Sequence, residues 1–403
     1  MDGKGETVHL IFVVRFDPFK SSSGTEIFAG NLALELAKQG HEVETVYEGR
    51  SSAGYSPSKP ENLKGHRLQL VGIPYVRSLD FRRKCSKRCS ELIKESRIDA
   101  VIAFGAGTFS GYIFDRIKKL NGKTLLIYYA MDSMMMEFER SKKSDEAARL
   151  FTRFKRWIWY SALIKSDKAS CINSELIFAS SKDTANHLIA DYRVPLAKIN
   201  LLYEGIPDDF AVGQDVIDPS IPTFLHITGG PRKGTDFFLK AMRLLEDKYG
   251  LSARAIIIRA SQSNIKQAET VGVEVDAYRS VNTLELKHQY ASCTAFVSPS
   301  LSEGFCLPVI EAAMFGKPTI AFGSGSLPEL INDGIDGFIV PIGDINRLTE
   351  RMYQISQDKD LRKRMHCAAK KKGQKLGINE CSQKFLNIIT ETKVRRKMEN
   401  THG

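Results

Sequence analysis

Hydrophobic and polar positions follow two alternating patterns along the chain. Short runs rich in Val, Ile, Leu and Phe are separated by segments in which apolar residues recur every three or four positions, as in 25–39 and 236–250. This alternation is typical of βαβ units, in which helices cover both faces of a parallel sheet. We therefore predict an α/β protein with strands in the runs VHLIFVVRF, HEVETVY, AVIAFG, KTLLIYYA, ELIFASS, KINLLYEG, TFLHITG, ARAIIIRA, VEVDAY, TAFVSPS and KPTIAFG.

The alternation is interrupted between Ile206 and Pro222, where IPDDFAVGQDVIDPSIP contains three prolines, four aspartates and no basic residue. This composition is typical of a linker, and 403 residues are too many for one hydrophobic core. We predict Rossmann-like, doubly wound domains at 1–206 and 223–380, a linker at 207–222, and a C-terminal helix at 381–403 that packs back on the first domain. Because such sheets bind ligands beyond the carboxyl ends of their strands, we expect the site in a cleft between the domains.

Composition indicates an ordinary folded protein, with 42% apolar and 26% charged residues. The start of the chain lacks the basic segment and cleavage site of a signal peptide, and no apolar run reaches the length of a membrane span. The seven cysteines show no metal-type spacing, and an odd number argues against a disulfide framework. We expect free thiols and a cytoplasmic protein.

The formal net charge of +11 is concentrated in two regions. Between Arg77 and Arg97 eight Lys and Arg stand against three Asp and Glu, and from Lys359 onward thirteen stand against four. Such patches fit phospholipid headgroups, a phosphorylated substrate or nucleic acid, and they are equally typical of solvated helix faces. Because no nucleic-acid recognition module accompanies them, we expect no nucleic acid partner.

The segment SDEAARLFTRFKRWIWYSALIKSD predicts an amphipathic helix. Its basic stripe comprises Arg149, Arg153 and Arg156. Its apolar face comprises Leu150, Phe154, Trp157 and Ile164. One interpretation is peripheral docking on a membrane, near a lipid-linked acceptor. The other is a core helix with a solvated Arg face.

The stretch SPSLSEGFCLPVIEAAMFGKPTI sets two carboxylates eight positions apart. Pro308 belongs at the start of a helix, so we expect Glu303 in the preceding loop and Glu311 on the first helical turn. The N–H groups of Phe305, Cys306 and Leu307 at such a junction would bind an anion. A carboxylate beside that anion site suits the two hydroxyls of a ribose, and the loop carboxylate suits a second sugar. A diphosphate with a sugar at each end fits all three elements.

The residues Glu303, Gly304, Phe305, Leu307, Pro308 and Glu311, followed by GKP and GSLPELINDGIDGFIV, resemble the signature of glycosyltransferase family 4. The similarity extends from about residue 8 to about residue 355. It implies a GT-B fold and a retaining transfer from a nucleotide-diphosphate sugar to an acceptor hydroxyl, in glycan, polysaccharide or glycolipid synthesis. It also implies no obligatory metal and no cofactor besides the donor, and no Asp-x-Asp loop suited to Mg²⁺ is present.

The resemblance assigns roles to individual residues. Glu311 would hold the ribose, and Glu303 would contact the donor sugar. Arg232 and Lys233, in GPRKGTDFFLKAM, would stabilise the departing diphosphate together with the amides after Gly304. The remaining assignments lie in the first domain: Ser23 and Gly24 in its glycine loop, and Asp132, which follows Met131 where the family has a histidine near the donor sugar.

Alternatives remain open at this point. The absent histidine is consistent with a nucleotide-sugar-binding partner protein that has no transferase activity. A nucleotide-sugar epimerase on the same architecture is disfavoured by the order of the motifs. A dinucleotide oxidoreductase is disfavoured because GAGTFSG has the wrong spacing for a G-x-G-x-x-G turn.

Overall fold

The computed structural model describes residues 6–21, 23–49, 60–72, 74–120, 122–136, 138 and 150–401. The chain forms two compact units, residues 1–205 with 378–403 and residues 206–377. Each unit contains one sheet whose strand pairs are parallel. The predicted α/β class with two Rossmann-like sheets is confirmed.

The first unit contains a seven-stranded sheet of order β3-β2-β1-β4-β5-β6-β7. Along β1, residues Leu10, Phe12 and Val14 face one hydrophobic cluster, whereas Ile11 and Val13 face another on the opposite side of the sheet. Side chains of successive strand residues point to opposite faces, so a run of continuous apolar residues requires cover on both faces. The strands are β1 (His9–Phe16), β2 (Glu42–Glu48), β3 (Leu63–Leu68), β4 (Ala100–Phe104), β5 (Leu125–Ala130), β6 (Leu176–Ala179) and β7 (Ile199–Leu201).

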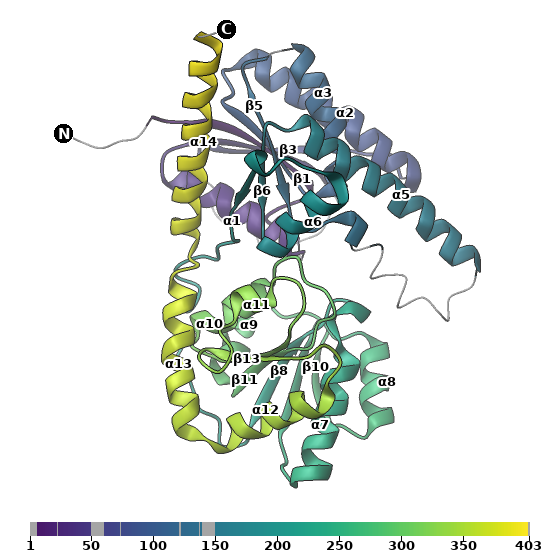
Figure 1. The fold of residues 1–403 in the computed structure, drawn as a ribbon, viewed down its shortest axis with the longest axis vertical. Coiled ribbons are helices and arrows are strands. Elements are labelled where there is room, and N and C mark those ends of the chain that lie inside the picture. The colour runs from purple at the N-terminus through teal and green to yellow at the C-terminus, as the bar shows by residue number, and fades with distance from the viewer. Residues whose placement is uncertain are drawn as a thin grey trace, which may run out of the picture. The chain divides into compact units, whose positions relative to one another are not determined.

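Two groups of helices provide this cover (Figure 1). One face packs against α1 (Gly24–Lys38) and the C-terminal helix α14 (Ile378–Thr401). The helices with side chains toward the other face include α2 (Pro74–Glu95), α3 (Ser110–Leu120), α5 (Leu150–Asn173) and α6 (Lys182–Tyr192).

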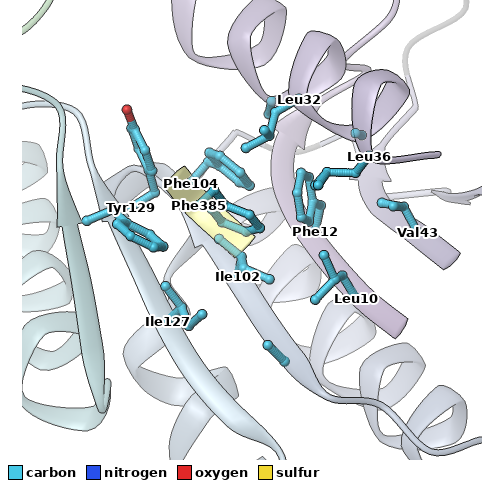
Figure 2. Packing of buried hydrophobic residues seen from close by; sticks show 14 of the residues in the cluster. Leu10, Phe12, Leu32, Leu36, Val43, Ile102, Phe104, Ile127, Tyr129 and Phe385 are labelled. Carbon is cyan, nitrogen blue, oxygen red and sulfur yellow. The ribbon is translucent and has the colours of Figure 1, made fainter. Parts of the chain in front are cut away.

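Helix α14 is anchored by an aromatic side chain at the centre of the first cluster (Figure 2). The ring of Phe385 is fully buried, 6.1 Å from that of Phe12 and 5.3 Å from that of Phe178. On the same helix, Lys393 forms an ion pair of 2.7 Å with Asp99. The last segment of the chain is therefore part of the first unit, and it begins at Ile378, three residues before the boundary expected from the sequence.

The second unit has a six-stranded sheet of order β10-β9-β8-β11-β12-β13. Its strands are β8 (Thr223–Ile227), β9 (Arg254–Ile258), β10 (Val275–Tyr278), β11 (Ala295–Ser298), β12 (Thr319–Phe322) and β13 (Gly337–Val340). Its helices are α7 (Thr235–Tyr249), α8 (Gln262–Val271), α9 (Thr283–Ser292), α10 (Leu307–Met314), α11 (Leu327–Leu330), α12 (Ile345–Gln357) and α13 (Lys359–Gln374).

The segment 207–222, expected as a linker, is packed into the second unit. The ring of Phe210 lies 5.9 Å from that of Phe315, and the N–H of Ile217 donates to the carbonyl of Ala291 at 2.9 Å. The buried ammonium of Lys317 donates to the carbonyl of Ile217 at 2.8 Å. Apolar side chains between the prolines and aspartates give this segment its contacts, so composition alone misplaced it.

Candidate functional site

Two loops at the carboxyl edge of the second sheet are joined by hydrogen bonds. A short 3-10 turn, Pro231–Lys233, follows β8, and the loop 299–306 follows the neighbouring strand β11. The N–H of Leu301 donates to the carbonyl of Arg232 at 2.8 Å, and the Arg232 guanidinium donates to the carbonyl of Ser302 at 2.8 Å. Gly234 has a φ of +70°, and a Cβ there would lie 1.9 Å from the carbonyl oxygen of Pro299. Only glycine allows this approach.

Glu303 lies in this loop and binds both predicted basic residues. Lys233 Nζ is 2.6 Å from Glu303 Oε1, and Arg232 Nη1 is 3.1 Å from Glu303 Oε2. Glu303 is only 1% exposed, whereas the Arg232 side chain is 49% exposed. Burial by itself would raise the pKa of Glu303, but the charges of Lys233 and Arg232 outweigh it and hold the pKa below its usual value. Glu303 is therefore an ionised group that fixes two cations at the edge of the sheet.

A second turn holds the loop from its other side. The N–H of Ser326 donates to the carbonyl of Glu303 at 3.1 Å, and the hydroxyl of Ser324 donates to the carbonyl of Ser300 at 2.6 Å. Gly325 has a φ of +54°, and a Cβ there would lie 1.9 Å from the carbonyl oxygen of Glu303. The backbone of the loop is thereby fixed between the turn after β8 and the turn after β12.

Helix α10 begins where this loop ends. Cys306 is the N-cap residue, Leu307 is the first helical residue, and Pro308 lies in the first turn. The first N–H groups of a helix have no acceptor within the helix, and the positive end of the helix dipole lies beside them. Burial raises the pKa of the Cys306 thiol to about 12, so the thiol is neutral and adds no negative charge at this end. The junction of Gly304 and Phe305 with α10 can thus bind an anion.

Glu311 lies just past the first turn of α10, one residue further into the helix than the sequence suggested, because the helix begins at Leu307. Its Oε2 accepts a hydrogen bond of 2.7 Å from the hydroxyl of Tyr290, which is fully buried in α9. Burial raises the pKa of Glu311, and the bond from Tyr290 partly opposes this effect. Tyr290 orients the carboxylate, and nothing in the sequence around Tyr290 indicated this role.

His226 supports the same edge from inside the sheet. Its Nδ1 is 3.0 Å from the carbonyl oxygen of Val297, and its Nε2 is 3.0 Å from the hydroxyl of Thr235. Burial lowers the pKa of His226 to about 4, so the ring is neutral at physiological pH. This histidine links β8, β11 and the start of α7, so its role is structural.

In the first unit, the predicted residues lie at the carboxyl edge of its sheet. Asp132 follows β5, and Ser23 and Gly24 begin α1, which follows β1. The side chain of Ser23 makes no capping hydrogen bond to the helix backbone. The end of β4 lies between these two places, since a Cβ on Gly105 would lie 3.8 Å from Thr25 and 3.9 Å from Met131.

The structure thus brings together Glu303, Gly304, Phe305, Cys306, Leu307 and Glu311 with Arg232 and Lys233 in the second unit, and places Ser23, Gly24 and Asp132 at one edge of the first. For the basic stripe of the amphipathic helix, Arg149 and the side chains of Arg153 and Arg156 lie outside the described residues, as do the side chains of Leu150 and Phe154. Sequence reasoning missed Tyr290, and it included Gly325 only as part of GSLPELINDGIDGFIV, without its role in holding the loop.

Two family models match the chain, one in each half. The family model described as Glycosyltransferase Family 4 matches residues 22–210, and the one described as Glycosyl transferases group 1 matches residues 228–372. An uncharacterized glycosyltransferase of Haemophilus influenzae is 23% identical over 373 residues, which cover 92% of this chain and 97% of that protein.

Solved structures match almost the full length. Sucrose-phosphate synthase from Thermosynechococcus elongatus has a TM-score of 0.76 at 17% identity, covering 95% of this chain and 98% of that one. HepE from Anabaena, solved with UDP and glucose, has a TM-score of 0.69 at 14% identity, covering 95% and 100%. These likenesses show the fold.

Proposed function

Since the chain belongs to the family 4, group 1 glycosyltransferases and has the GT-B fold, we propose that it is a retaining, metal-independent hexosyltransferase. It would move a sugar from a nucleotide-diphosphate donor to an acceptor hydroxyl in glycan, polysaccharide or glycolipid synthesis. The observation that carries the proposal is the cluster of Glu303 with Lys233 and Arg232, beside the helix that bears Glu311.

The donor is held by groups of the second unit. The N–H groups of Phe305, Cys306 and Leu307 bind the diphosphate, and the Glu311 carboxylate, oriented by Tyr290, accepts two hydrogen bonds from the ribose diol. Arg232 and Lys233 face the roughly two negative charges that develop on the leaving diphosphate, and preorganised cations of this kind lower the barrier.

Transfer would proceed on one face of the sugar. The bond between the anomeric carbon and the phosphate oxygen breaks, and the acceptor oxygen forms its bond on the same face. The departing phosphate oxygen takes the proton of the acceptor hydroxyl. Asp132, in the turn after β5, contacts a hydroxyl of the transferred sugar in this proposal. The negative charge of Glu303 keeps the two cations in place.

The acceptor side is proposed to lie on a membrane surface on the cytoplasmic side. Among the described residues, no helix combines the length and the apolar character needed to cross a bilayer. Exposed apolar side chains are nevertheless present on two helices of one layer: Leu79 on α2, and Trp157, Ile158 and Trp159 on α5. Helix α2 carries basic residues in addition to the exposed Leu79. This combination suits an anionic lipid surface near a lipid-linked acceptor.

A vesicle experiment tests the membrane contact. Sedimentation with anionic vesicles should remove the protein from solution at low salt, and added salt should reverse this binding. A Trp157→Ala, Trp159→Ala variant should pellet less than an Ile172→Ala variant, in which an exposed residue at the far end of α5 is changed. Absence of pelleting at low salt would count against a membrane surface.

The donor is tested with a panel of UDP-, GDP- and ADP-sugars. UDP-glucose comes first because HepE from Anabaena was solved with it. One donor should raise the Tm. With acceptors including inositol 3-phosphate, for which a related Streptomyces protein is named, the same donor should yield a product with retained anomeric configuration, which NMR would detect. Stabilisation without transfer to any acceptor extract would favour a non-catalytic nucleotide-sugar-binding protein. No stabilisation by any donor would reject both.

A further inference from the structure

A buried aspartate lies beneath the turn that carries Asp132. Asp167, in α5, has no exposed surface. Its Oδ1 accepts a hydrogen bond of 2.5 Å from the hydroxyl of Tyr128 in β5, and its Oδ2 accepts one of 2.9 Å from the hydroxyl of Tyr192 in α6. The same Oδ2 accepts the backbone N–H of Met134 at 3.1 Å. One carboxylate therefore joins a strand, two helices and the turn after β5.

The turn after β5 is held through four consecutive N–H groups. The N–H of Ser133 donates to Asp132 Oδ1 at 2.8 Å, and that of Met134 donates to Asp167. The N–H of Met135 donates to the hydroxyl of Tyr192 at 3.3 Å. The N–H of Met136 donates to the hydroxyl of Ser133 at 3.5 Å. Two of these four bonds depend on Asp167, either directly or through the tyrosine hydroxyl that it orients.

Asp191 in α6 and Ser180, which follows β6, bind two further polar groups of the turn. The hydroxyl of Ser133 donates to Asp191 Oδ2 at 2.7 Å, and the hydroxyl of Ser180 donates to the carbonyl of Met131 at 2.9 Å. His187 Nδ1 lies 3.6 Å from Asp191 on the same helix. The conformation of the backbone on both sides of Asp132 is thus set by side-chain hydrogen bonds.

We propose that Asp167 is a positioning residue for glycosyl transfer, whose carboxylate holds the turn 131–136 so that Asp132 keeps its orientation toward the transferred sugar. The proposal rests on the proposed function, which assigns Asp132 to that sugar. All three groups that donate to Asp167 are hydroxyl or amide groups, so the carboxylate form satisfies each of them.

Ionisation of Asp167 makes this support sensitive to pH. Burial raises the pKa of Asp167 to about 6, against the effect of its three hydrogen bonds, and the charge of Asp191 on α6 raises it further. The other titratable groups that face it are Tyr128 on β5, Tyr192 on α6, and Cys171 on its own helix, whose thiol stays neutral because burial raises its pKa. A protonated Asp167 leaves one O–H or N–H donor without an acceptor, which loosens the turn. Transfer should therefore slow as the pH falls through about 6.

Substitution of two neighbours of Asp167 should shift the acidic limb of kcat against pH in opposite directions. Tyr192→Phe removes a hydrogen bond that lowers the pKa of Asp167, so the acidic limb of kcat against pH should move to higher pH. Asp191→Asn removes a charge that raises this pKa, so the limb should move to lower pH. Asp183→Asn, on the same helix and also beside His187, is the matched control and should leave the limb in place.

Removal of the carboxylate itself should lower kcat without weakening donor binding. Asp167→Asn keeps the shape of the side chain but turns an amide N–H₂ toward a hydrogen-bond donor. A misplacement of about 1 Å at a reacting group costs about 100-fold in rate, so kcat should fall by that order while the Kd for the nucleoside diphosphate stays within twofold. Equal loss of both would indicate a merely structural role and overturn the proposal.

Hydrogen exchange of the peptide spanning 131–136 provides a readout that needs no transferase activity. Exchange of this peptide, corrected for intrinsic pH dependence, should rise as Asp167 becomes protonated, with the same shifts in Tyr192→Phe and Asp191→Asn. If exchange follows these shifts but the protein transfers no sugar, the proposed function fails and the support by Asp167 stands. If transfer occurs and its pH limb ignores both variants, the positioning role is refuted.

Discussion

Replacing Lys233 by Met tests the ion cluster in the second unit most severely. The variant leaves the ionised carboxylate of Glu303, which is 1% exposed, with Arg232 as its remaining cation, and that side chain is half exposed. Removing one partner of a buried ion pair costs about 3–5 kcal/mol. Because Arg232 still contacts Oε2, we expect the lower end, about 3 kcal/mol, or a Tm lower by roughly 6–12 °C for a unit of this size.

The assay is thermal and urea unfolding of the full chain with three comparison proteins. Lys240→Met removes a solvent-exposed lysine on α7, 3.8 Å from Asp236, and should cost less than about 1 kcal/mol. Glu303→Gln and the double variant Lys233→Met, Glu303→Gln complete a double-mutant cycle. The double variant should be more stable than the sum of the single losses allows, because no uncompensated buried charge remains.

The contribution of Glu303 to stability should depend on pH, and the direction follows from its lowered pKa. The pKa of Glu303 is lower in the folded state than in the unfolded chain, so its contribution is fully present above the ordinary glutamate pKa and is lost as the pH falls through the folded pKa. The difference in stability between the wild type and Lys233→Met should therefore be largest near pH 7 and shrink below about pH 4. A difference that does not change with pH, or one no larger than that of Lys240→Met, would refute the ionised cluster.

Three further predictions concern groups that support the two units. Tyr290→Phe removes the hydroxyl that orients Glu311 and should weaken nucleoside diphosphate binding about fivefold, in line with the loss of about 1 kcal/mol for one hydrogen bond; calorimetry measures it, and unchanged affinity would contradict the role. Phe385→Ala should destabilise the first unit by about 3–5 kcal/mol in urea unfolding, whereas Val394→Ala, exposed on the same helix, should change stability by less than about 0.5 kcal/mol; equal effects would refute the anchoring of α14. Gly325→Ala forces a Cβ against the carbonyl of Glu303, so it should lower both the Tm and donor affinity, and a neutral result would show that the turn can move at no cost.

Much of the fold could be predicted because central parallel strands are continuous apolar runs. Strand β3, LKGHRL, was missed because it lies at the edge of the described sheet, next to β2, and three of its six residues are exposed, so it carries no apolar run. Strand β13, at the edge of the second sheet, was likewise not identified as a strand. The segment 207–222 was misjudged because its few apolar residues, such as Phe210, are spaced too irregularly to show a period.

The residue types of the candidate site could also be predicted, but their partners could not. Glu303 lies 70 positions from Lys233, and their ion pair arises because β8 and β11 are neighbours in the sheet. The roles of Tyr290 and Asp167 could not be predicted for the same reason. In the sequence both are ordinary residues of amphipathic helices, and only the fold brings Tyr290 to Glu311 and Asp167 to Tyr128. Sequence patterns report the period of an element and the chemistry of a loop, whereas contacts between distant elements depend on strand order.

The ribose preference of the nucleotide site tests the role of Glu311 in donor binding most directly. Calorimetry would compare the best nucleoside diphosphate from the donor panel with its 2′,3′-dideoxy analogue, in the wild type and in Glu311→Ala. If the Glu311 carboxylate binds the ribose diol, the wild type should prefer the ribonucleotide by tenfold or more, since each hydrogen bond to a charged group contributes about 1.5–3 kcal/mol. Glu311→Ala should lose this preference while still binding the dideoxy analogue as the wild type does. Equal affinity of the wild type for both nucleotides would contradict binding of the ribose diol by Glu311.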